Sequence, residues 1–289
     1  MSDKLGFAII GLGHRAERHA GAISRLKNGY LCAAYSRSMK KAEEFSSRHR
    51  CQNIYDEVEY LLDDYKVDVV VISSPNALHL DQAKKAIASG RSIIVECPIE
   101  IEPTRVLELL DRADEEGVFV SSPIEMAFSD EFLDFRQRLQ NLSIGSVQKV
   151  EVNMSLKQPS YGVSTKWRVD PELYGKSKIV AEGFQTLFLL VSLFGSPRDI
   201  ECSGTLKGTL ENGAELTIEI NSDKEDAIRI YSESGTFNLP CSREKSSEIL
   251  LDRFYSNYIS SMETGTVMCI NRANLCRAIE LAQKISVLL

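Results

Sequence analysis

Short apolar runs and amphipathic stretches alternate over the first 122 residues of the chain. The apolar runs cover residues 7–10, 30–35, 67–73, 92–96 and 118–121, and most are nearly continuous, as expected of strands buried on both faces. Between them, residues 15–26, 40–48, 58–65, 80–89 and 104–116 show helical spacing of apolar side chains. Gly90 and Gly117 follow two of these stretches as helix stop signals. The alternation predicts a parallel sheet flanked by helices.

The pattern changes after residue 128. An amphipathic segment that ends near residue 141 leads to residues 147–156, which alternate as a half-exposed strand does. Residues 179–194 form an apolar helix. Alternating runs then cover residues 198–206, 214–221 and 228–239, with turns at Asn212-Gly213 and Ser234-Gly235, before closing helices at 247–264 and 272–289. This half is typical of an open, mostly antiparallel sheet with helices on one face, which is an α+β arrangement.

Composition and charge narrow the classes of partner. The chain has 289 residues, of which 43% are hydrophobic, and 34 Lys and Arg against 41 Asp and Glu leave a net charge of -7. Such a chain lacks the broad positive field of proteins that bind nucleic acid or anionic membranes. The longest apolar runs are far shorter than the roughly 20 residues that cross a bilayer, and we expect neither a signal peptide nor a membrane span.

The cysteines and histidines argue against a structural metal. The seven cysteines are scattered and form no C-x-x-C, so we expect no disulfide framework, no zinc site and a cytoplasmic location. All four histidines lie in the first 80 residues, which excludes a histidine-based metal site in the second half. We predict that the protein holds no metal.

A glycine-rich turn follows the first predicted strand. Residues 8–16, AIIGLGHRA, contain the G-x-G-x-x-A variant of the dinucleotide fingerprint. Gly11 permits a tight turn, and Gly13 lets the backbone approach a pyrophosphate at a helix N-terminus. A chance glycine turn is the alternative, but the position directly after a buried N-terminal strand favours a Rossmann domain. The pyrophosphate loop would consist of Gly11, Gly13, His14, Arg15 and Ala16.

The end of the second strand indicates which cofactor is bound. NAD-binding chains usually carry Asp or Glu there, which holds the ribose 2′-hydroxyl. This chain instead has Ser36, Arg37 and Ser38, followed by Lys40 and Lys41. A guanidinium fork and serine hydroxyls suit a 2′-phosphate, so we predict NADP(H) rather than NAD(H). The alternative is that these cations simply form a solvated helix start.

Two further strand ends should border the nicotinamide half, because ligands of this fold bind beyond the carboxyl ends of the strands. One strand ends at SSPN and the next at Glu96-Cys97-Pro98. For His79, a plain helix-capping role is the alternative. The residues expected to line the ribose and nicotinamide are Ser73, Ser74, Pro75, Asn76, His79 and Glu96.

These segments together resemble the glucose–fructose oxidoreductase/inositol dehydrogenase (Gfo/Idh/MocA) family over nearly the whole chain. The resemblance rests on GLGHRAERHA, ISSPNALHLDQAKKAIASGRSIIVECP, ENGAELTIEI, IRIYSESGTFNL and INRANLCRAIELAQ. It implies an N-terminal Rossmann domain, residues 1–122, and an α+β domain, residues 123–289, whose open sheet carries the substrate. It also implies a homo-oligomer formed through that sheet.

The chain departs from the family at its catalytic positions. The family motif E-K-P has Cys97 in place of its lysine, and the motif D-x-G-x-H-x-x-D aligns with Ala181, Gln185 and Phe188 in place of Asp, His and Asp. Oxidation of a sugar alcohol needs a positioned base for the hydroxyl proton. Reduction of a polarised conjugated bond is less demanding, because solvent or the substrate can supply the proton.

Within the family, the chain looks most like the biliverdin reductase branch, which has Tyr at the position of Cys97. Glu125 matches a Glu of that branch, while an Arg that the branch places near Gln185 is absent here. Thiazolinyl imine reductases, which reduce a C=N bond, also have a replaced lysine. Each candidate also has a structural alternative, such as packing for Cys97 or an ion pair for Glu125. The candidates around the substrate are Cys97, Glu125, Gln185 and Tyr161.

The sequence therefore favours an NADPH-dependent reductase of a conjugated C=C or C=N bond in a small substrate. The polar loop that contains Tyr161 and Trp167 also carries several lysines and arginines, which suit an anionic substrate. One alternative is a cofactor-holding regulatory protein without turnover, motivated by the lost catalytic residues. Another is an NADP-dependent sugar dehydrogenase with relocated acid–base groups, such as Tyr174 or Lys176.

Overall fold

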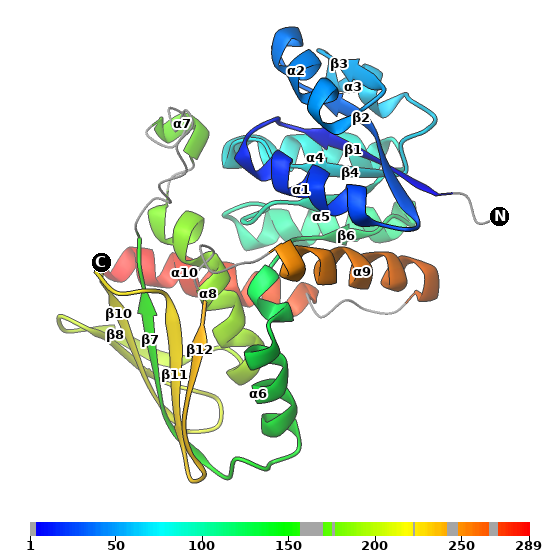
Figure 1. The fold of residues 1–289 in the computed structure, drawn as a ribbon. Coiled ribbons are helices and arrows are strands. Elements are labelled where there is room, and N and C mark those ends of the chain that lie inside the picture. Colours follow the sequence, from blue (N-terminus) through cyan, green and yellow to red (C-terminus); the bar gives the residue numbers. More distant parts are fainter. Residues whose placement is uncertain (1–3, 157–169, 175–176, 222, 242–247, 266–270) are drawn as a thin grey trace.

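The computed structural model describes residues 4–156, 170–174, 177–221, 223–241, 248–265 and 271–289. The first half forms a six-stranded parallel sheet in the order β3-β2-β1-β4-β5-β6 (Figure 1). Its strands are β1 (Leu5–Ile10), β2 (Gly29–Tyr35), β3 (Asn53–Tyr55), β4 (Val69–Ile72), β5 (Ser92–Val95) and β6 (Val120–Ser121). The predicted parallel sheet is therefore confirmed.

Helices flank this sheet as the alternating pattern predicted. They are α1 (His14–Arg25), α2 (Met39–His49), α3 (Val58–Leu62), α4 (His79–Ala88) and α5 (Pro103–Glu116), with a short 3-10 turn, η1 (Asn76–Leu78), before α4. Strand β4 is fully buried along its length, which explains its unbroken run of β-branched side chains. Strand β3 was not predicted, because its three half-buried residues form no apolar run.

The second half forms another six-stranded sheet, in the order β12-β11-β7-β10-β9-β8. The strands are β7 (Val147–Met154), β8 (Arg198–Cys202), β9 (Leu206–Thr209), β10 (Glu215–Ile220), β11 (Ala227–Ser232) and β12 (Gly235–Pro240). The sheet is antiparallel except where β7 and β10 pair in parallel. Residues 198–206 form two strands rather than one, because Gly204 adopts a φ of 84° in a turn between them. The mostly antiparallel α+β arrangement is confirmed.

The remaining helices connect and cover the two sheets. They are η2 (Glu125–Phe128), α6 (Asp130–Gln140), α7 (Pro171–Tyr174), α8 (Lys178–Phe194), α9 (Glu248–Thr264) and α10 (Arg272–Leu288). Helix α8 lies between the second sheet and α10, which explains why it is apolar around most of its circumference (Figure 1). No helix within these ranges is both long and apolar enough to cross a membrane.

Helix α9 packs on the first sheet although it follows the second in sequence. Tyr255 and Tyr258 are fully buried. The Tyr255 ring meets the edge of Phe7 with centroids 5.7 Å apart, and the Tyr258 ring meets Phe119 in the same way. Arg25 of α1 adds an ion pair to Asp252 of α9 at 2.8 Å. Helix α9 thus belongs to the second half in sequence and to the first in packing. The domain boundary between residues 122 and 123 stays a prediction.

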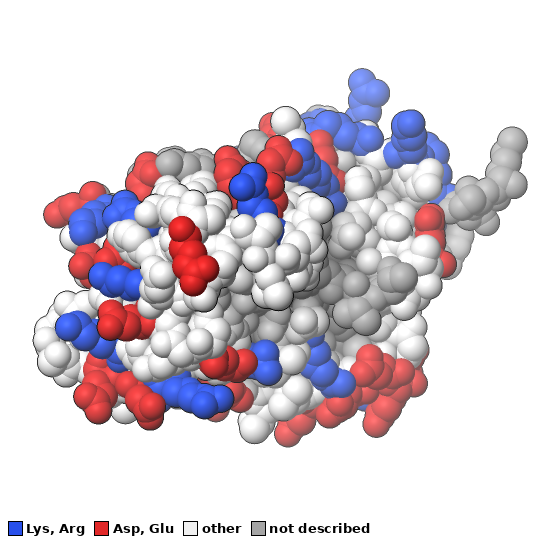
Figure 2. Space-filling view, turned by 90° about the horizontal axis from the view of Figure 1, so that it is seen from below, with Lys and Arg blue, Asp and Glu red and all other residues white. Residues whose placement is uncertain are grey.

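Surface charges of both signs are interspersed. Figure 2 shows acidic and basic side chains close together around areas of uncharged residues on the face seen from below. This face carries no broad basic field, in keeping with the net charge of -7.

We predict that Tyr255→Phe destabilises the fold. Burial raises the pKa of Tyr255 well above its ordinary value, so the hydroxyl keeps its proton and donates to Nδ1 of His19 at 2.8 Å. The variant leaves this buried nitrogen without its donor, at a cost of about 1–3 kcal/mol in the free energy of unfolding. Urea denaturation measures the loss. Tyr65→Phe, at a side chain that is 84% exposed, is the matched control. Equal effects of the two substitutions would contradict the assignment.

Candidate functional site

The glycine loop after β1 has a geometry that only glycine accepts at its first position. Gly11 has a φ of 87°, and a Cβ there would lie 2.6 Å from the main-chain nitrogen of Ser74. The Ser73 hydroxyl donates to the carbonyl oxygen of Gly11 at 2.7 Å. The loops after β1 and β4 therefore pack backbone to backbone at the carboxyl edge of the sheet.

The second glycine leaves room for a ligand. Gly13 is the N-cap of α1 and is exposed. A Cβ added at this position would have no heavy atom within 4 Å. No side chain caps the helix, so main-chain N–H groups of its first turn face this space. Burial, together with the Arg15 and Arg18 cations, lowers the pKa of His14, so this exposed imidazole is neutral near pH 7. These features fit a pyrophosphate at the helix N-terminus, with the small buried side chain of Ala16 packing beneath it.

The residues after β2 leave hydroxyl protons and a cation facing outward. The Ser36 oxygen accepts from the main-chain nitrogen of Ser38 at 3.2 Å, and the Ser38 oxygen caps α2 by accepting from the nitrogen of Lys41. Both hydroxyls can still donate. Arg37 is exposed and pairs with no carboxylate of the described residues. The set fits a 2′-phosphate, which needs donors and positive charge.

His79 joins two loops rather than facing a groove. Its ring is fully buried, with Nδ1 2.8 Å from the carbonyl oxygen of Pro98 and Nε2 2.8 Å from that of Ser74. The Ser74 hydroxyl donates to Gln82. The sequence placed His79 beside the cofactor, whereas the structure buries it behind the segments that would line one. The half-buried Ser73, Pro75 and Asn76 remain at the surface of this edge.

A buried ionic cluster lies beneath the first turn of α1. The Arg15 guanidinium bonds to Glu96 through Nε at 2.7 Å and to Glu125 through Nη2 at 2.5 Å, while Arg18 bonds to the other oxygen of Glu125 at 2.6 Å. Burial alone would lower the pKa of Arg15, but Glu96 and Glu125 outweigh that effect and raise it. The guanidinium therefore stays charged at every accessible pH.

His19 extends the cluster to α9. Burial lowers the pKa of its fully buried imidazole more than the bond to Glu96 raises it, so His19 is neutral at pH 7. Because a carboxylate only accepts, Nε2 donates to Glu96 at 2.8 Å, and Nδ1 accepts from Tyr255. The sequence analysis missed His19, although its helical spacing between Ala16 and Ile23 on the buried face of α1 could have indicated a buried histidine.

Cys97 directs its thiol inward. The side chain is 3% exposed, and Sγ lies 2.9 Å from the Ser122 oxygen. Since the Ser122 hydroxyl donates to the carbonyl oxygen of Val95 at 2.6 Å, the thiol is the donor in the Cys97–Ser122 bond. Its proton thus points into the protein, which favours the packing interpretation over acid catalysis.

A family model described as "Oxidoreductase family, NAD-binding Rossmann fold" matches residues 5–123. This match covers less than half of the chain and supports the resemblance to Gfo/Idh/MocA oxidoreductases over the first sheet. The predicted resemblance and the Rossmann fold for a nicotinamide cofactor are confirmed, and the comparisons support an NAD(P)-dependent oxidoreductase.

Individual relatives differ in their named activities. The scyllo-inositol 2-dehydrogenase (NADP(+)) IolU of Bacillus subtilis is 26% identical over 81% of this chain and 71% of its own length. Alignments with the next three curated relatives span only 41–64% of those proteins. At these identities the substrate does not follow from the relative.

Two solved structures share the fold. A Synechocystis biliverdin reductase in complex with biliverdin and NADP+ superposes with a TM-score of 0.78 at 16% identity, covering 98% of each chain. The WlbA dehydrogenase of Bordetella pertussis, in complex with NADH and UDP-GlcNAcA, has a TM-score of 0.83 at 18% identity, covering 100% of this chain and 96% of its own. These likenesses establish the fold alone.

Helix α8, which the sequence aligned with the Asp and His of the Gfo/Idh/MocA motif, belongs to the hydrophobic core. Ala181, Gln185 and Phe188 of α8 are all buried, and Gln185 Nε2 donates to the carbonyl oxygen of Cys241 at 3.3 Å. Gln185, a candidate substrate contact from the sequence, is thus committed to the second sheet. Tyr161 lies outside the described residues.

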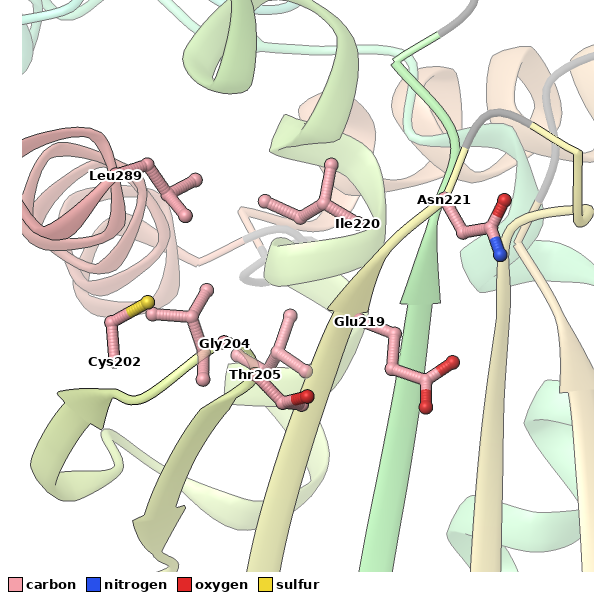
Figure 3. Close-up of a pocket in the computed structure, with 9 residues that line it drawn as sticks. Cys202, Gly204, Thr205, Glu219, Ile220, Asn221 and Leu289 are labelled. Atoms are coloured by element: carbon pink, nitrogen blue, oxygen red, sulfur yellow. The ribbon is translucent and has the colours of Figure 1, made fainter.

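A separate hollow lies at the edge of the second sheet and holds none of the predicted site residues (Figure 3). In Figure 3, Leu289, Ile220 and Cys202 surround it, while Glu219 points away from Leu289. It lacks the cofactor loop and the charged groups of the edge described above. The full lining comprises Cys202, Gly204, Thr205, Leu206, Ile218, Glu219, Ile220, Asn221 and Leu289.

We predict that Gly13→Ala and Gly11→Ala separate binding from folding. At Gly13 the methyl group enters open space at an ordinary φ of -99°, so stability falls by about 1 kcal/mol or less, whereas NADPH binding weakens at least about tenfold. At Gly11 the methyl group meets main-chain atoms at positive φ, and stability falls by more than about 2 kcal/mol. Thermal unfolding and calorimetric titration measure the two effects. Wild-type NADPH affinity in Gly13→Ala would contradict the placement of the pyrophosphate.

Proposed function

We propose that the protein is an NADPH-dependent reductase that delivers a hydride to a conjugated C=C or C=N bond of a small anionic molecule. The observation that carries this proposal is the chemistry of the family's catalytic positions. The Cys97 thiol donates a hydrogen bond to Ser122, and the aligned face of α8 is packed as core. A site built this way offers no base at these positions to accept a hydroxyl proton.

Bound NADPH supplies the hydride. The residues of the chain would hold the cofactor: main-chain groups from Gly13 onward would bind the pyrophosphate, and Arg37 with Ser36 would bind the 2′-phosphate. In a reduction, the acceptor carbon is already electron-poor, and solvent or the substrate supplies the proton. No strong acid is then required beside the substrate.

The anionic character of the substrate rests on the sequence alone. Lys178, exposed at the first turn of α8, is the described member of the group of cations predicted around the polar loop.

We also propose that the open face of the second sheet mediates a homo-oligomer. Strand β7 alternates buried and more exposed side chains, as a sheet covered on one face does, and light scattering of the purified protein tests the mass.

One specific observation favours a second candidate function. The named activity of IolU is that of an NADP-dependent scyllo-inositol dehydrogenase, and that relative aligns over 81% of this chain. Oxidation of a polyol by this protein would need an acid–base group from outside the positions described above.

We predict that turnover separates these functions. Purified protein is mixed with NADPH and either biliverdin or a cyclic imine, and in parallel with NADP+ and scyllo-inositol or myo-inositol. We expect NADPH consumption with a conjugated acceptor and no polyol oxidation above the Gly13→Ala control. Polyol oxidation alone would replace the proposal by the dehydrogenase. Tight NADPH binding without turnover on any class would favour a regulatory, cofactor-holding protein.

We predict that Arg37→Ala lowers the affinity for NADPH by about 10- to 100-fold and leaves that for NADH unchanged, since a charge-assisted bond to the 2′-phosphate is lost. Lys207→Ala, which removes an exposed cation from β9, is the control for net charge. Calorimetric titration with both nucleotides provides the comparison. An unchanged preference for NADPH in Arg37→Ala would show that the 2′-phosphate binds elsewhere.

A further inference from the structure

Glu125 is committed to the cofactor helix. It is 2% exposed, and its two oxygens bond to two guanidinium groups of α1, Arg15 at 2.5 Å and Arg18 at 2.6 Å. The residue begins η2, the turn through which the chain leaves the first sheet toward α6 and the second sheet. A carboxylate in this arrangement is poorly suited to orient a substrate, so of the two roles that the sequence left open the structure favours the ion pair.

Arg15 also bonds to Glu96, which the sequence predicted to lie beside the nicotinamide. Its Nε and Nη2 both lie within 2.7 Å of one oxygen of Glu96, the residue between the end of β5 and Cys97-Pro98. The pairs join residues 110 and 81 positions apart in sequence. One planar guanidinium therefore connects η2, the first turn of α1 and the residue after β5.

This connection depends on geometry as well as charge. A guanidinium fork can bond to two carboxylates in fixed directions, whereas a lysine ammonium is a single point charge on a flexible stem. On its other side Glu96 is held by His19, and His19 by Tyr255 of α9. Loss of Glu125 would leave Arg15 bonded to Glu96 but would remove the carboxylate that holds the guanidinium from the side of η2.

We propose that Glu125 is a positioning residue that acts through Arg15 and Glu96 to place the Cys97-Pro98 segment against the nicotinamide. This inference rests on the proposed NADPH-dependent function. It assigns Glu125 no contact with the substrate or the cofactor. We expect its effect to be confined to the nicotinamide half, because in the proposed site the main chain at Gly13 binds the pyrophosphate.

Electrostatics alone would act in the opposite sense. Removing the Glu125 carboxylate leaves uncompensated positive charge beside the first turn of α1, which strengthens the binding of any anionic pyrophosphate. Affinity for NADPH by itself therefore mixes two effects. A ligand that keeps the pyrophosphate and 2′-phosphate but lacks nicotinamide, 2′-phospho-ADP-ribose, reports the charge effect alone.

The test compares calorimetric affinities for NADPH and 2′-phospho-ADP-ribose in wild type, Glu125→Gln and Glu17→Gln. Glu17 is also on α1 and also ion-paired, but to Arg48 and His49 of α2, so its substitution is the matched control for charge. We expect the ratio of NADPH to 2′-phospho-ADP-ribose affinity to fall about tenfold in Glu125→Gln and to stay constant in Glu17→Gln. Arg15→Lys, which keeps the charge without the fork, should lower the ratio likewise and serves if Glu125→Gln does not fold.

An unchanged ratio in Glu125→Gln and Arg15→Lys, with only a lower melting temperature, would overturn the inference and make Glu125 a structural brace. An equal fall in Glu17→Gln would also overturn it, since the effect would then not depend on the contact between Glu125 and Arg15. If wild type binds neither ligand, the proposed function fails and this inference fails with it. Wild-type binding with an unchanged ratio leaves the proposed function standing.

Discussion

The hydrogen bonds from Arg15 to Glu96 and Glu125 hold α1, the end of β5 and η2 against one another. Burying charged groups is costly unless each has a partner in good geometry, and here two guanidinium groups face two carboxylates, with a neutral His19 and Tyr255 completing the hydrogen bonds. These contacts come from α1, the end of β5, η2 and α9. The glycine loop, the segment before Cys97 and the entry to the second half are thereby fixed against one another.

The same cluster shapes the chemistry that we propose. Glu96, which the sequence placed near the nicotinamide, and Glu125, a candidate around the substrate, are both bound to arginines, and the Cys97 thiol donates to Ser122 inside the protein. The described site therefore combines donors for phosphate with an absence of basic groups at the family's catalytic positions. This balance suits transfer of a hydride to an electron-poor carbon better than removal of a proton from an alcohol.

Sequence patterns predicted what local physics determines. Buried strands such as β4 are unbroken apolar runs, and Gly11 follows the first of them, so the sheet and the cofactor loop were both foreseeable. The parallel pairing of β7 with β10 and the return of α9 to the first sheet depend on contacts between distant segments. For the same reason the partners of Glu125 could not be read from the sequence, which left an ion pair and a substrate contact as equal alternatives. For His79 the sequence left a cofactor contact and a capping role open, because the two main-chain carbonyls beside its ring leave no sequence signal.

A crystal structure with NADP(H) bound would test the central claim most directly. The account predicts the pyrophosphate at Gly13, the 2′-phosphate against Arg37, and nicotinamide C4 facing a space that no lysine, histidine or unpaired carboxylate enters. A basic side chain reaching that space from another part of the chain, within hydrogen-bond distance of a bound alcohol, would contradict it.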